Sequence, residues 1–228
     1  MRIAVLLAIV TVMASSGYFA AAQGNDFRWS GALAPNKTID IRATNGSVRA
    51  IVSVDRLVHV VARYIEPADA LVQVVEHDRG VTVCATSRVE FEVRVPPGVH
   101  LTASLTEGDI DVERLRSDVT VSSIGASVRI ESSEFTTSAT SVSGNVLVSL
   151  PRDANAYFHA TTVRGTIDSD FAVLPIAPLP PAPMRLPDGR QAGPSIPLPP
   201  QIVGATIGRG GPELRVTTVS GNIRLRQR

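Results

Sequence analysis

Apolar and polar residues alternate along much of the chain with a period of two. Runs such as TIDIRA, LVHVVARY and EFEVRV, all between residues 38 and 95, place Val, Ile or Phe at every second position. This period is typical of β-strands that have one buried face and one solvated face. Spacing close to that of a helix occurs after the leader only near residues 67–76, between segments that read as strands. The pattern therefore predicts an all-β fold.

A short unit centred on glycine recurs six times, as in SVSGNVLV and TVSGNIRL. In most copies a Val or Ile follows the glycine by two residues, which predicts a tight corner followed by a strand with one buried face. Glycine suits a corner because it adopts positive φ without a Cβ clash. In the third copy the apolar pair begins one residue later, which predicts a bulge or a longer corner. The six glycines are Gly46, Gly108, Gly125, Gly144, Gly165 and Gly221.

The spacing of the units favours one arrangement of strands over another. The middle four glycines are 17, 19 and 21 residues apart, close to one turn of a solenoid. A solenoid-like stack of short strands, preceded by an N-terminal β-sheet region, is therefore predicted. The alternative is an antiparallel β-sandwich in which Asn45-Gly46 and Ser143-Gly144 form hairpin turns.

The first residues predict export. Arg2 precedes an apolar run from Ile3 to Met13, and small residues ending in three alanines lead to Gln23. This order is typical of a secretory signal peptide, so residues 1–22 are expected to be removed. The run is shorter than the roughly 20 residues of a membrane-spanning helix, and no other segment is long or apolar enough to span a bilayer. The mature chain is predicted to have no transmembrane segment and to be periplasmic, extracellular or on the cell surface.

The mature chain divides into two predicted regions. Residues 23–95 form an N-terminal β region, and residues 96–228 form the glycine-centred repeat region. The boundary is placed at VPPGV because Pro96 and Pro97 cannot donate hydrogen bonds to a β-ladder. A Pro-rich loop, residues 174–200, interrupts the repeats and is expected to be extended.

Charge, cysteine and histidine content argue against a nucleic-acid partner, a disulfide and a metal or cofactor site. Removal of residues 1–22 leaves equal numbers of basic and acidic residues, so no nucleic-acid partner is expected. The single cysteine, Cys84, excludes an internal disulfide and is expected to be a buried, unreactive thiol. The four histidines lack the spacing of metal ligands, so neither a metal nor a cofactor is expected.

Two acidic pairs are the only candidates for catalysis. Asp109 and Asp111, with Glu113 beyond them, share one face of a predicted strand, and Asp168 and Asp170 form a second pair. Paired carboxylates would suit an enzyme that acts on polysaccharides. No His, Lys or Arg is placed in the sequence to complete such a site, and charges are common on the solvated face of a strand. The sequence therefore predicts a protein that is not an enzyme.

Several elements together resemble a known family. TIDIRATNGSVRA, VRVPPGVHLTASLTEGDIDV and the C-terminal IGRGGPELRVTTVSGNIRLRQR are similar to elements of bacterial putative adhesins of the DUF4097 type. The resemblance spans residues 27–228 and implies an envelope protein built from repeated short strands, without catalytic or binding residues to transfer. Some relatives act in envelope stress or in resistance to membrane-active peptides, which gives an alternative function.

The expected function is that of an exported, non-enzymatic envelope protein, an adhesin-like binding or structural module. Its outward Thr, Ser, Asn and Asp side chains would face an envelope polymer or an unknown protein partner. Exposed strands at the ends of the stack would also favour self-association unless they are capped.

Overall fold

The computed structural model describes residues 19–23, 26–65, 72–131, 135–175 and 201–228. Their regular structure is entirely β-strand, and the strands form one 17-stranded sheet. Residues 1–18 of the predicted signal peptide and residues 176–200 of the Pro-rich loop lie outside the described residues, whereas residues 19–22 are part of β1 and residues 174–175 form β14. The strands are β1 (Phe19–Gln23), β2 (Asp26–Gly31), β3 (Thr38–Val52), β4 (Val58–Tyr64), β5 (Val72–His77), β6 (Gly80–Val95), β7 (His100–Glu113), β8 (Val119–Ser123), β9 (Ser127–Glu131), β10 (Thr137–Ser141), β11 (Val146–Leu150), β12 (Ala156–Thr162), β13 (Ile167–Ser169), β14 (Leu174–Pro175), β15 (Gln201–Ile207), β16 (Glu213–Thr218) and β17 (Ile223–Gln227).

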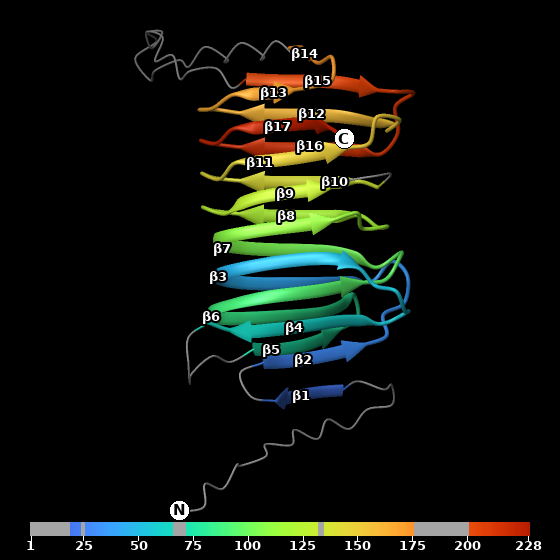
Figure 1. Ribbon diagram of the computed structural model, residues 1–228, viewed down its shortest axis with the longest axis vertical. Coiled ribbons are helices and arrows are strands. Elements are labelled where there is room, and N and C mark those ends of the chain that lie inside the picture. The colour runs from blue at the N-terminus through green and yellow to red at the C-terminus, as the bar shows by residue number, and fades with distance from the viewer. Residues whose placement is uncertain (1–18, 24–25, 66–71, 132–134, 176–200) are drawn as a thin grey trace, which may run out of the picture.

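The strands stack as rungs, most of which contribute to two opposing faces (Figure 1). Towards the two ends, β2, β4, β5 and β15 pair antiparallel with their neighbours. Within a rung the chain runs along one face, turns a corner and returns along the other. We call the first the hydroxyl face, which contains β8, β10, β16 and β12, and the second the charged face, which contains β9, β11, β17 and β13. Strands β3, β6 and β7 are long enough to run through both faces, so the whole assembly is one sheet.

Neighbouring repeat rungs pair in parallel, which decides between the two predicted architectures. β8 pairs with β7 and β10, and β9 pairs with β7 and β11, all in parallel. A hairpin would instead pair the strands on either side of one corner. The all-β fold is therefore confirmed, the parallel stacking of these rungs agrees with the solenoid-like arrangement, and the hairpin turns that the sandwich alternative placed at Asn45-Gly46 and Ser143-Gly144 are wrong.

The rungs are not stacked in sequence order. β3 pairs with both β6 and β7, so an early segment lies between two later ones. At the other end, β16 lies between β10 and β12, and β17 lies between β11 and β13. Hydrogen bonds also continue across the predicted boundary at residues 95/96, because β6 and β7 share β3 as their neighbour. The division into two regions stays a prediction.

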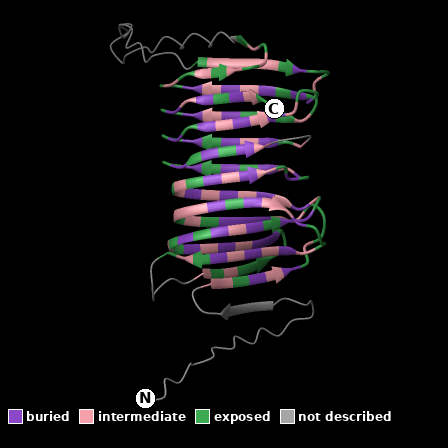
Figure 2. Ribbon diagram, viewed as in Figure 1, coloured by how far each residue is buried: buried purple, intermediate pink, exposed green. Residues whose placement is uncertain are grey.

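The core lies between the two faces and is built from the inward members of each strand (Figure 2). Ile110, Val128, Val146 and Ile223 are at most 2% exposed and occupy equivalent register positions on β7, β9, β11 and β17. Burying each such side chain stabilises the fold by about 1.5–3 kcal/mol. Phe91 and Trp29 fill the N-terminal end of the core.

Buried hydroxyls stand just inside the corners, where the core meets polar backbone. Ser141 is 1% exposed, and its Oγ accepts hydrogen bonds from the backbone N–H of Gly144 and from Ser123 Oγ, both at 2.9 Å. Thr162 Oγ1 instead donates a hydrogen bond to the carbonyl oxygen of Gly221, at 3.2 Å. These hydroxyls satisfy the backbone groups that the tight corners would otherwise leave buried and unpaired.

The corner glycines are required for two different reasons. Gly46 and Gly108 have φ angles of +129° and +124°, as the sequence led us to expect. The expectation of positive φ is wrong for the other four glycines. At Gly144 the requirement is close approach, since a Cβ there would lie 1.8 Å from the carbonyl oxygen of Ala126 in the next rung.

Gly125 differs from the other corner glycines. A Cβ there would lie 3.6 Å or more from its neighbours, and its φ is not positive. The residue that stands under Gly144 in the stack is Ala126, which is fully buried. In this unit the position that packs against the next corner glycine is therefore Ala126 and not Gly125, which accounts for the shift of one residue seen in the sequence.

Candidate functional site

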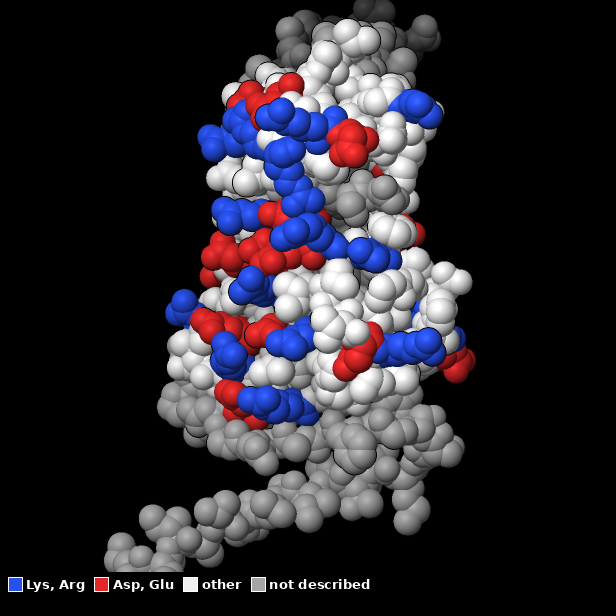
Figure 3. All heavy atoms as spheres, turned by 45° about the vertical axis from the view of Figure 1, so that its right-hand side comes forward, with Lys and Arg blue, Asp and Glu red and all other residues white. Residues whose placement is uncertain are grey.

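The charged face carries a row of outward side chains that crosses successive rungs. Its register places, in order, Arg49, Asp111, Arg129, Leu147, Arg224 and Asp168 side by side on adjacent strands. A parallel row towards the corners holds Ser47, Asp109, Ser127, Asn145, Asn222 and then Thr166. Figure 3 shows acidic and basic side chains interspersed along one side of the stack.

A shallow groove lies between these two rows. It has a volume of about 500 Å³ and crosses β7, β9, β11 and β17. Volumes of 300–1,000 Å³ are typical of ligand sites. The outward side chains that line it are Asp109, Asp111, Ser127, Arg129, Asn145, Leu147, Asn222 and Arg224.

The charged groups of the groove are unpaired, unlike most charges around them. Among the described residues, none of Asp109, Asp111, Arg129 and Arg224 has an ion-pair partner within 4.0 Å. The charged neighbours of these groups in the row have ion-pair partners. Arg49 binds Glu113 at 2.6 Å, and Asp168 binds Arg226 at 2.6 Å. The groove therefore leaves two carboxylates and two guanidinium groups free for a ligand.

Asp111 is the most constrained of these groups. Its Oδ1 is buried and has no hydrogen-bond partner. Burial raises the pKa of the Asp111 carboxyl, and the negative charge of Glu113 raises it further, while Arg129 and Arg49 oppose the shift. A buried carboxylate oxygen without a donor is destabilising unless a ligand or solvent supplies one.

An asparagine ladder holds the corner side of the groove in place. The backbone N–H of Asn222 donates to Asn145 Oδ1, and the backbone N–H of Thr166 donates to Asn222 Oδ1, each at 3.0 Å. Sequence reasoning did not single out these two asparagines. The signal was present, because Gly144-Asn145 and Gly221-Asn222 are the two glycine units with Asn directly after Gly.

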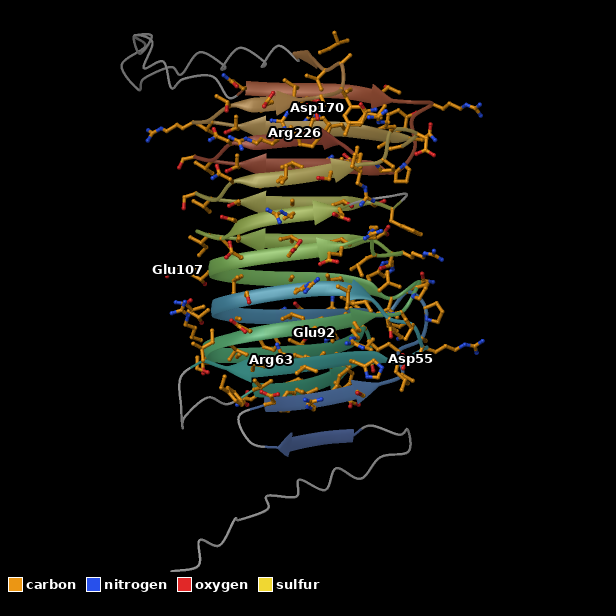
Figure 4. All side chains as sticks on the ribbon, viewed as in Figure 1. Asp55, Arg63, Glu92, Glu107, Asp170 and Arg226 are labelled. Carbon is orange, nitrogen blue, oxygen red and sulfur yellow. The ribbon has the colours of Figure 1, made fainter. Side chains whose placement is uncertain are left out.

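The second predicted acidic pair has a structural role. Arg226 binds Asp168 at 2.6 Å and Asp170 at 2.7 Å, and thus ties β17 to β13 (Figure 4). Hydrogen bonds from the backbone N–H of Gln227 and from Arg226 lower the pKa of Asp170. The structure therefore separates the two acidic pairs: one is bound to an arginine, and the other lies in the groove.

The opposite, hydroxyl face is almost free of charge at its centre. Thr102, Thr120 and Ser138 form one outward row, and Ser104, Ser122 and Thr140 form the next. Cys84 continues the second row beyond Arg42. The expectation that this thiol is buried is wrong: it is half-exposed, because it alternates with inward Val83 and Ala85.

Two further observations concern metals and membranes. Within the described ranges, no group of three or more His, Cys, Asp or Glu side chains could hold a metal ion. The same ranges contain no helix of the length and hydrophobicity that crossing a bilayer requires.

No protein-family model matches the sequence, and no curated protein matches it either. A solved structure is similar in fold: the crystal structure of a putative cell adhesion protein from Clostridium sporogenes ATCC 15579. The TM-score is 0.55 at 11% sequence identity, and the match covers 88% of this chain and 99% of that chain. At this identity the likeness concerns the fold. The chain thus shares its all-β fold with that protein.

Proposed function

We propose that the protein is an exported, non-enzymatic, adhesin-like binding module of the cell envelope, and that it binds through the charged face. The observation that carries the proposal is the groove on that face, whose four charged side chains have no partner. Charged groups on a protein surface are ordinary, but the neighbours of these four in the row, Arg49 and Asp168, are each bound to a charge outside the row, Glu113 and Arg226. A groove with unsatisfied charges suits recognition of a polar ligand.

Two further observations support this function. The putative cell adhesion protein has a similar fold, and the sequence elements quoted above resemble adhesins of the DUF4097 type. Export is part of the proposal and rests on the leader at residues 1–22. Cell fractionation should find the protein in the periplasm or the medium, and N-terminal sequencing should find Gln23 as its first residue; recovery of the whole protein in the cytoplasm with its leader intact would contradict export.

Binding is tested with residues 23–228 on immobilised envelope fractions. We expect the wild type to be retained, and the double variant Arg129→Gln/Arg224→Gln to lose most of its retention. The control is Arg215→Gln, which removes one positive charge from the hydroxyl face, where Arg215 pairs with Glu213, and is compared with each single variant, Arg129→Gln and Arg224→Gln, as well as with the double variant. If wild type and both variants are retained equally, the charged face is not the binding surface. If the wild type is not retained, the binding function is wrong.

A further inference from the structure

We infer that the groove on the charged face recognises a zwitterionic chain, one that carries free ammonium and free carboxylate groups along its length. This inference rests on the proposed binding function and names the class of ligand. Its basis is the order of the unpaired charges along the stack: both acids lie on β7, and both bases lie on β9 and β17.

The acidic end can accept hydrogen bonds from a ligand. Asp109 and Asp111 stand two residues apart on β7, on the same side of the sheet. Asp111 Oδ1 is buried without a hydrogen-bond donor: Arg49 on one side is bound to Glu113, and Arg129 on the other side acts on Asp111 through its charge but donates no hydrogen bond to it. An ammonium group offers three donors and a positive charge, which match two carboxylates better than a neutral hydroxyl does.

The basic end requires an acceptor. Arg129 and Arg224 flank Leu147 on the one rung between them, so they are two strand spacings apart, or about 9.6 Å at about 4.8 Å per spacing. Leu147 between them is half-buried and offers no charge. Two free guanidinium groups that face one groove are suited to carboxylates, which accept two parallel hydrogen bonds from each.

The spacing of the charges indicates an extended ligand. Asp111 and Arg224 are three rungs apart, or about 14 Å at the same strand spacing. A single amino acid is too short to join the two ends, whereas a polymer that lies along the stack passes all four groups. No aromatic side chain is among the described residues of the groove, so recognition does not depend on ring stacking.

Other ligand classes match the charges less well. A purely anionic polymer that bound both arginines would pass Asp109 and Asp111 with like charge. A purely cationic polymer would meet the same conflict at Arg129 and Arg224. Like charges brought together in a binding site are strongly unfavourable, so the order of acids and bases selects against both.

One family of oligosaccharides tests the inference because its charges can be changed separately. Carboxymethyl chitosan carries amines and carboxylates, carboxymethyl chitin carries carboxylates alone, and chitosan carries amines alone. Binding of each to residues 23–228 is measured by calorimetry at low ionic strength, where surface charges are least screened. We expect the zwitterionic oligosaccharide to bind at least about tenfold more tightly than either singly charged one, as expected for one additional charge-assisted contact.

Variants assign each charge to its end of the groove. Asp111→Asn should weaken the zwitterionic probe about tenfold and should tighten carboxymethyl chitin, because it removes a like charge from the path of the polyanion. Arg224→Gln should weaken the same zwitterionic probe and should tighten chitosan for the corresponding reason. Arg215→Gln is again the control, and circular dichroism verifies that each variant is folded.

The outcomes separate this inference from the proposed function. If carboxymethyl chitin binds as tightly as the zwitterion and Asp111→Asn has no effect, the ligand is a polyanion and the inference is wrong. If none of the three probes binds although envelope fractions still retain the wild type, the ligand class is wrong and the binding function stands. If neither probes nor envelope bind, the binding function itself fails.

Discussion

Replacement of Gly144 by alanine should disrupt the middle of the stack. The new Cβ would lie 1.8 Å from the carbonyl oxygen of Ala126 and 2.7 Å from its carbonyl carbon. Ordinary contact begins near 3.4 Å, so the two rungs must separate by about 1.6 Å at this corner. Backbone atoms on both sides form the contact, and no flexible side chain can move away. Relief would therefore stretch the ladders from β10 to β8 and from β11 to β9.

The expected loss is large compared with ordinary substitutions. Rung separation breaks hydrogen bonds and opens the core, so we expect about 4 kcal/mol or more, in the range reached by few mutations. A folded domain has only about 5–15 kcal/mol in total. For a chain of this size the loss should lower Tm by at least about 8 °C. Thermal and urea unfolding followed by circular dichroism measure both quantities.

Two matched variants keep this prediction refutable if Gly144→Ala does not fold. Gly125→Ala introduces the same methyl group where the nearest atom is 3.6 Å away, so the stability should change by less than about 1 kcal/mol. Gly165→Ala meets Gly221 at 2.1 Å, but β13 is at the end of the charged face and can shift outwards, so we expect about 1–3 kcal/mol. Equal Tm shifts for Gly144→Ala and Gly125→Ala would refute the argument from close approach.

Three smaller effects should also be measurable. Ser141→Ala should cost about 1–3 kcal/mol in urea unfolding, because it leaves a buried backbone N–H unpaired, whereas exposed Ser143→Ala should change little. The Asp55 carboxyl should have a pKa of about 2 when titrated by NMR, since hydrogen bonds from His59 and Ser53 lower it from 3.8. The stability that this carboxylate contributes is present above pH 3.8 and is lost as the pH falls towards 2. The variant Asp55→Asn should not show this loss. Asp111→Asn should raise Tm at neutral pH and not at low pH, because the raised pKa of Asp111 means that the folded state disfavours the ionised carboxylate. A lower Tm of this variant at neutral pH would show that the unsatisfied Asp111 oxygen does not destabilise the fold.

Much of the architecture could be predicted from the sequence because its causes are local. Alternation of apolar residues identified the strands, and glycines with a Val or Ile two residues later identified the corners. The order of the rungs could not be found in this way, because β17 lies beside β11 through contacts such as Asn222 to Asn145, 77 residues apart. Spacing along the chain carries no information about such an insertion.

The candidate site was found only in part for a related reason. Asp109 and Asp111 could be named because both lie on one strand, with a period of two. Arg129 and Arg224 belong to other rungs, and nothing in their local sequence marks them as unpaired. Their freedom depends on where Arg49 and Asp168 find partners, which only the register between strands reveals.

The inserted position of β16 and β17 has a consequence for how the chain assembles. Until residues 213–227 arrive, β10 and β12 lack the neighbour that joins them, and so do β11 and β13. Without them, β10 and β11 on one side and β12 and β13 on the other are separated by the width of one rung. The stack is complete only when the C-terminal strands β16 and β17 insert between these two parts. Loss of these strands would therefore divide the stack in its interior, where loss of an outer strand would merely shorten it.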